Sequence, residues 1–252
     1  MFESWFSLPV GILIATVVST VGIGGGVLWM PFLLIIVKLK PDTAVVTSLL
    51  IQTAGMGSGT LAFWRKRRID FRLMAFALLV TIPGVGVGAY LTRMLAPVHL
   101  ELILGCLTLV AALAFVSAQQ NYGEAGRERA EITTAKRYGW AIGTMAVASG
   151  MLSVSIGEWL VPLLRSKFSL RMRVAIATSI ATVFGTCVLA LLFHGLMGAR
   201  VDLPSLLWAV PGVIIGGQIG PRITGHINDR ILKELFIFLL TLIGIHLIYN
   251  SY

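Results

Sequence analysis

The chain has 252 residues, of which 57% are hydrophobic and 12% are charged, and its formal net charge is +9. A soluble domain carries about 25% charged residues, so this composition, with a mean hydropathy of +0.89, excludes an ordinary soluble protein. Segments of about 20 residues without charge recur along the chain, enough to cross ~30 Å of hydrocarbon. We therefore predict an all-α integral membrane protein embedded in the lipid bilayer, with no nucleic-acid partner.

Hydropathy predicts eight apolar segments, at residues 8–37, 43–64, 73–92, 98–118, 139–164, 174–195, 203–221 and 231–249. The connections are short except for residues 119–138, which hold four basic and three acidic side chains. This polar stretch predicts an N-terminal membrane repeat (1–118), a cytoplasmic linker (119–138) and a C-terminal membrane repeat (139–252). The N-terminus has no basic stretch, so we expect no cleaved signal peptide.

The first apolar segment contains four glycines within five residues, between Gly22 and Gly26. As one helix, residues 8–37 would be about 45 Å long, which is too long for a simple crossing. Eight full crossings would divide the 20 Lys and Arg residues 10 to 10. If the first and fifth segments instead return to the side they entered from, the division becomes 16 to 4, as the positive-inside rule favours. We predict two re-entrant hairpins and six crossings, with a tilted, broken crossing as the alternative.

The two halves of the sequence resemble each other. Pro31 and Pro162 are 131 residues apart, and the same offset pairs Thr47-Ser48 with Thr178-Ser179. Further on, residues 69–71 resemble 201–203, and residues 82–88 resemble 210–216. A long, nearly constant offset indicates an internal duplication. With three crossings in each half, the halves insert with opposite orientation, so we predict two inverted repeats, each a broken hairpin plus three transmembrane helices.

The first break is typical of an anion site. The half-helix after Gly26 begins with free backbone N–H groups and the positive end of its dipole. The backbone of Gly24, Gly25 and Gly26 lets a ligand approach closely because glycine has no side chain. The alternative is that these glycines only permit tight packing between helices.

The second break offers the hydroxyls of Ser153 and Ser155, followed by Gly157 and Glu158. Hydroxyls donate hydrogen bonds to an oxyanion, so we expect these residues to complete the anion site. An ionisable group at mid-membrane is a functional hypothesis by default, and Glu158 is our candidate for proton coupling. The alternative for Glu158 is a carboxylate bound by the backbone N–H groups of its own helix start.

Further polar residues are predicted to line the cavity between the repeats: Thr47, Ser48, Thr178, Ser179 and Gln52. The hydroxyls have the alternative of bonding back to helix carbonyls. Gln52 and Gln218 either line the path or join neighbouring helices. His194 is expected at the membrane interface. The spacing of the two cysteines predicts no metal site or disulfide.

The glycine-rich break that ends in Pro31, and its half-repeat around Pro162, resemble the TauE/SafE family of membrane permeases over nearly the whole chain. The resemblance implies a permease of the cell inner membrane for sulfur-containing anions such as sulfite, sulfoacetate and other organosulfonates, often an exporter. One departure stands out: the second break of that family is usually rich in glycine, whereas here it reads Ser-Val-Ser-Ile-Gly-Glu.

The leading hypothesis is therefore a secondary transporter that exports a small sulfur-containing anion by alternating access, without cofactor or metal. A passive anion channel with the same site is one alternative. An intramembrane serine hydrolase, with Ser153 or Ser155 as nucleophile and His194 as base, is another, although no Gly-x-Ser-x-Gly elbow is present.

Overall fold

The computed structural model describes residues 4–117, 126–198, 200–223 and, near the C-terminus, 234, 237–238, 241–242, 244–246 and 248–249. Its elements in chain order are η1 (Ser4–Phe6), α1 (Ser7–Val21), α2 (Gly26–Pro31), η2 (Phe32–Ile36), α3 (Pro41–Arg65), α4 (Phe71–Met94), α5 (Pro97–Ser117), α6 (Ile132–Leu152), α7 (Gly157–Ser166), α8 (Met172–Leu196) and α9 (Leu203–Ile223). Within the described ranges every regular element is helical, apart from one isolated bridge between Arg127 and Leu170.

Several helices have the length and composition of membrane spans. Four described helical stretches, at Ser4–Val21, Phe71–Met94, Met172–Leu196 and Leu203–Ile223, are long and apolar enough to cross a bilayer. The expected eighth segment, residues 231–249, lies largely outside the described residues. The sequence placed the end of the central linker at residue 138, but α6 begins at Ile132. Polar residues continue the helix there because lysine and arginine are good helix formers.

Both predicted breaks are present, and they have the same backbone geometry. α1 ends at Gly22, whose φ of 85° is left-handed, and its N–H bonds to Val18 O at 2.9 Å. α6 ends at Ser153 with φ 57°, and its N–H bonds to Ser149 O at 3.1 Å. Glycine adopts this conformation freely, whereas serine is strained in it. Each break continues as a short non-helical segment before α2 or α7 begins.

The structure repeats itself along the chain. α2 and α7 begin 131 residues apart, and α3 and α8 both begin and end at that offset. The other left-handed residues also form pairs at this offset, Lys38 with Ser169 and Arg67 with Gly198. α4 and α9 begin 132 residues apart. The sequence comparison aligned residues 82–88 with 210–216 through their Pro-Gly pairs, which is one helical turn out of register with these helix starts.

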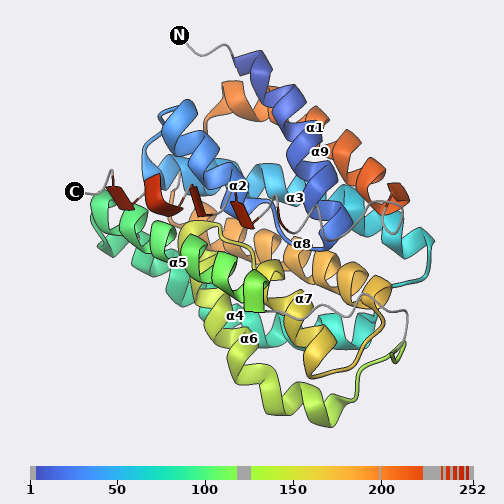
Figure 1. The fold of residues 1–252 in the computed structure, drawn as a ribbon. Coiled ribbons are helices and arrows are strands. Elements are labelled where there is room, and N and C mark those ends of the chain that lie inside the picture. Colours follow the sequence, from blue (N-terminus) through green and yellow to red (C-terminus); the bar gives the residue numbers. More distant parts are fainter. Residues whose placement is uncertain are drawn as a thin grey trace.

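Glycines set how the helices pack. In α9, Gly212, Gly216 and Gly220 have no room for a Cβ, because the carbonyls of Leu8, Ile12 and Thr16 in α1 lie against them. The residue numbers rise together in both helices, so α1 and α9 are parallel. Gly84 and Gly88 of α4 meet the carbonyls of Gly143 and Val147 of α6 in the same way. Figure 1 shows α1 beside α9 at one end of the molecule and α4 beside α6 at the other, with α3 and α8 between them. Small residues at helix contacts are typical of membrane proteins.

The central pair, α3 and α8, runs in opposite directions. Gly57 of α3 faces the ring of Phe184, and Gly59 faces Ile180, so the residue numbers rise in one helix as they fall in the other. α3 is parallel to α9, because Gly55 meets Val213 and Gly59 meets the Gly217 carbonyl. α1, α3 and α9 therefore share one direction.

The segment after the first break runs back against α3. At its start, Gly26 is next to Gln52, about halfway along α3. At its end, η2 stops at Ile36, four residues before Lys40, the N-cap of α3. α1 thus advances in the direction of α3, and α2 with η2 returns toward the end at which α3 begins.

Candidate functional site

The two helix breaks contact each other inside the molecule. A Cβ at Gly24 would overlap the Cβ and Oγ of Ser155, and a Cβ at Gly26 would overlap the carbonyl oxygen of Ser153. Gly24 and Ser155 occupy equivalent positions of the two halves. Glycine is required on the first break because the chain of the second break occupies the space of a side chain. We call residues 22–26 and 153–157 together the break junction.

Gln52 of α3 binds the second break through its side-chain amide. Its Nε2 donates to Ser153 Oγ at 2.6 Å, to Ser153 O at 3.0 Å and to Ser48 Oγ at 3.2 Å. Ser153 Oγ in turn donates to Ser48 Oγ at 3.0 Å. All three side chains are at most 2% exposed. The structure therefore brings Ser48, Gln52 and Ser153 together as one buried hydrogen-bonded group, while Gln52 Oε1 has no partner among the described residues.

Two more of the predicted hydroxyls belong to the break junction. Ser179 Oγ of α8 donates to Gly22 O at 2.8 Å. Ser155 Oγ accepts from the backbone N–H of Gly157 at 2.9 Å, which satisfies the first free N–H of α7. Gly25 has more space than its neighbours, since a Cβ there would lie 3.0 Å from the Trp29 ring and 3.6 Å from Gln52 Cγ.

Thr47 and Thr178 do not face the break junction. Thr47 Oγ1 accepts from the backbone N–H of Asp202, and Thr178 Oγ1 accepts from that of Asp70, both at 3.0 Å. Each aspartate then caps its own helix by accepting the N–H three residues on. Each threonine thus anchors a helix start of the other half, because consecutive residues of a helix point about 100° apart. The repeated aspartates were the sequence signal for these contacts.

Glu158 is the most unusual side chain of the site. It is 1% exposed, and neither carboxylate oxygen has a hydrogen-bond partner among the described residues. It lies in the first turn of α7, where the positive end of the helix dipole favours negative charge. Its equivalent in the first half is Val27. The alternative of a carboxylate bound by backbone N–H groups finds no such hydrogen bond in the described structure.

His194 and Gln218 have structural partners. His194 was expected at the membrane interface, but it is 3% exposed and its Nε2 is hydrogen-bonded to Gly150 O at 2.8 Å. The Gly150 carbonyl lies in the last turn of α6, where helix carbonyls lose their intrahelical donors. No hydrogen bond joins His194 to Ser153 or Ser155 in the part of the chain that is described. Gln218 Nε2 donates to Ser58 O at 2.8 Å and so joins α9 to α3.

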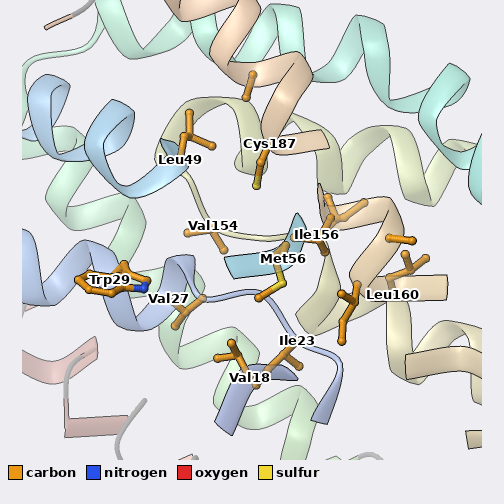
Figure 2. Close-up of a cluster of buried hydrophobic side chains, with 14 of the residues drawn as sticks. Val18, Ile23, Val27, Trp29, Leu49, Met56, Val154, Ile156, Leu160 and Cys187 are labelled. Carbon is orange, nitrogen blue, oxygen red and sulfur yellow. The ribbon is translucent and has the colours of Figure 1, made fainter. Parts of the chain in front are cut away.

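Apolar side chains enclose the break junction. Figure 2 shows Ile23 and Val27 of the first break region close to Val154 and Ile156 of the second, together with Met56 of α3. These side chains belong to the buried core. The surroundings of the junction therefore have a low dielectric constant, in which unpaired polar groups are costly.

The buried charges have a clear pattern. Among the described residues the buried ionisable groups are Asp70, Glu158 and His194, with no lysine or arginine. An anion at the break junction would meet neutral donors only.

Basic residues instead gather at the end where α3 and α9 finish and α4 and α8 begin. There Lys66 Nζ donates to Pro221 O at 2.7 Å. Partial burial lowers the pKa of Lys66 below its ordinary value, and the neighbouring charges of Arg68, Arg222 and Arg173 lower it further.

Comparison with known proteins gives a consistent result. A model of the family described as sulfite exporter TauE/SafE matches residues 7–247. YunE of Bacillus subtilis (strain 168), described as a probable membrane transporter protein, is 23% identical over 96% of this chain and 96% of its own length. YjnA of the same organism has the same description and is 24% identical over 90% of this chain and 94% of its own length. No solved structure matches.

Proposed function

The chain belongs to the TauE/SafE family of membrane transporters, and from this premise we propose that it exports a small sulfur-containing anion by alternating access. Sulfite and organosulfonates are the proposed substrates, as the printed family description suggests. The proposed site is the break junction with its neighbours Ser48, Gln52 and Ser179. Thr47 and Thr178 serve this site indirectly, by anchoring the helix starts of the opposite half.

The proposed membrane architecture is two inverted repeats with re-entrant hairpins. The antiparallel crossing of α3 and α8, which are equivalent helices, supports opposite insertion of the halves. The return of α2 and η2 against α3 supports the hairpin over a broken crossing. With these helix directions, Lys38, Lys40, Arg93 and Arg200 fall at one membrane face, and the other basic residues of the described chain fall at the opposite face. By the positive-inside rule that opposite face, with the central linker, is cytoplasmic in the inner membrane.

One observation carries the proposal: two helix breaks, far apart in sequence, meet in a buried polar junction without any basic side chain. Backbone N–H groups at the starts of α2 and α7 and the amide of Gln52 are neutral donors aimed at a common region. Such donors suit a small oxyanion that must be released again, because each neutral hydrogen bond contributes only about 0.5–1.5 kcal/mol net.

Alternating access requires the two halves to exchange roles. The reciprocal contacts of Thr47 with Asp202 and Thr178 with Asp70 give both halves equivalent anchors. Glu158 breaks this symmetry, and we assign it to proton coupling because its unpartnered carboxyl group is the ionisable group within the break junction's own helix start.

The test is flux in proteoliposomes. Vesicles with purified protein are loaded with sulfite, thiosulfate, sulfoacetate or sulfate, and efflux is measured with and without a pH gradient. Accumulation of a sulfur-containing anion against its gradient, abolished by an uncoupler, is the expected result. Flux only down the gradient, insensitive to the uncoupler, would instead identify a channel, and no flux of any of these anions would reject the substrate class.

A pair of variants tests the site. Gln52→Leu removes the amide donor at the break junction, and we expect it to abolish flux. Gln218→Leu is the matched control, because that glutamine also donates to a serine on a neighbouring helix but lies outside the junction. Equal flux losses in the two variants would contradict the assignment.

A further inference from the structure

The end of α1 carries a buried hydroxyl without a partner. Ser19 is 0% exposed, and its Oγ has no hydrogen-bond partner among the described residues. It lies in the last turn of α1, three residues before the left-handed Gly22. An unbonded hydroxyl in a dry interior is unfavourable, so the chain gains stability if something binds there.

A backbone oxygen borders the same space. Pro221 lies within α9 and has no N–H, so the carbonyl of Gly217 lacks its normal intrahelical donor. A methyl group at Gly59 of α3 would lie 3.5 Å from Ser19 Oγ and 3.6 Å from Gly217 O. Both oxygens therefore flank the position of the side chain that Gly59 does not have.

The equivalent place in the second half is occupied differently. There the position of Ser19 is Gly150, whose carbonyl is bonded to His194 Nε2 at 2.8 Å. The position of His194 in the first half is Phe63, which has no hydrogen to donate. The position of Gly59 is Ala190, which fills the space with a methyl group. The second half thus closes its helix end with a donor and a methyl, whereas the first half presents oxygens.

We infer that this space, between the end of α1, Gly59 and Gly217, binds a small monovalent cation such as Na⁺. Carbonyl and hydroxyl oxygens are hard ligands suited to such ions, and the end of α1 carries the partial negative charge of a helix C-terminus. Transporters with broken helices coordinate cations at half-helix C-termini of this kind. The inference extends the proposed function, since a cation beside the break junction would offset the charge of an anion bound there without lysine or arginine.

The test measures cation binding without any substrate. Thermal unfolding of the purified protein in detergent is followed by tryptophan fluorescence in NaCl and in choline chloride of equal ionic strength. We expect Na⁺ to raise the unfolding temperature of the wild type. Gly59→Ala should remove that rise without unfolding the protein, because the added methyl makes ordinary contacts of 3.4 to 3.6 Å. Ser19→Ala should weaken it.

Two controls match these variants. Gly143→Ala adds a methyl with equally ordinary contacts, at 3.5 and 3.6 Å, to α6, and Ser149→Ala removes a buried hydroxyl one turn before the second break. Both should keep the full response to Na⁺. Equal unfolding temperatures of the wild type in Na⁺ and choline would overturn the inference, as would a full response in Gly59→Ala and Ser19→Ala. Because no anion is present, these outcomes are independent of whether sulfur-containing anions are transported.

Discussion

The contact between Gly24 and Ser155 makes a quantitative prediction. A Cβ at Gly24 would approach Ser155 closer than the 3.0 Å that real Cβ atoms keep, and the atoms in its way are Cβ and Oγ of a short side chain. No rotation moves the Ser155 Cβ, so the backbone of one break has to shift. Overpacking of a tight interior costs roughly 1–3 kcal/mol, and we expect Gly24→Ala to lie at the upper end, about 3 kcal/mol.

Replacing Ser155 by glycine should relieve that cost. Ser155→Gly alone removes the hydrogen bond to the Gly157 N–H, which costs about 1 kcal/mol. In the double variant the alanine methyl occupies the space of the lost serine side chain, and its nearest remaining neighbour is the residue 155 Cα at 3.3 Å. We therefore expect the double variant to be more stable than Gly24→Ala alone, with a coupling free energy of about 2–3 kcal/mol.

The assay is reversible unfolding of the purified proteins in mixed detergent micelles, comparing wild type, both single variants and the double variant. Additive free energies would show that the two breaks do not contact each other as described. A Gly24→Ala variant as stable as the wild type would refute the reasoning directly. Proteoliposome flux of the double variant then separates packing from binding, since restored stability without restored flux assigns Ser155 to the substrate.

Three further predictions concern the anchors, the carboxylate and the topology. Thr47→Val and Thr178→Val each leave a backbone N–H of the other half without its acceptor, so both should lower the free energy of unfolding by a similar amount, about 1–3 kcal/mol; a loss in one variant only would argue against equivalent anchors. Glu158→Gln should retain anion binding, measured by isothermal titration calorimetry, but make flux independent of the pH gradient; flux that still follows the gradient would remove Glu158 from proton coupling. Cysteines introduced at Lys38 and Arg67 should react with membrane-impermeant reagents from opposite faces, and labelling from one face would reject the proposed helix directions.

Much of the break geometry could be read from the sequence. Glycines in the middle of an apolar run mark a helix interruption because glycine is unfavourable in a helix and alone adopts left-handed backbone without strain. The constant spacing of Pro31 and Pro162 located the second break even though Ser153 replaces glycine there. The comparison with known proteins confirmed the family that these motifs indicate.

Other features depended on contacts between distant parts of the chain. Thr47 and Ser48 are neighbours in sequence and were predicted to share one cavity, yet Thr47 holds the start of α9 while Ser48 binds Gln52 and Ser153. The hydrophobic pattern could not separate them, because both are buried. His194 was predicted at the interface from its place at a helix end, but a carbonyl freed by the second break provides a buried partner.

The sequence by itself determined that the chain is a membrane protein of two related halves, each with a break, because hydropathy, glycine and proline act locally and repeat with the chain. Only the tertiary structure decided that the breaks contact each other, and that the two halves differ where it matters for ions. Ser19 with Gly59 and Gly150 with Ala190 are equivalent pairs, yet one leaves oxygens unbonded and the other does not. That difference arises from which helices pack together, and the spacing of residues along one chain does not contain it.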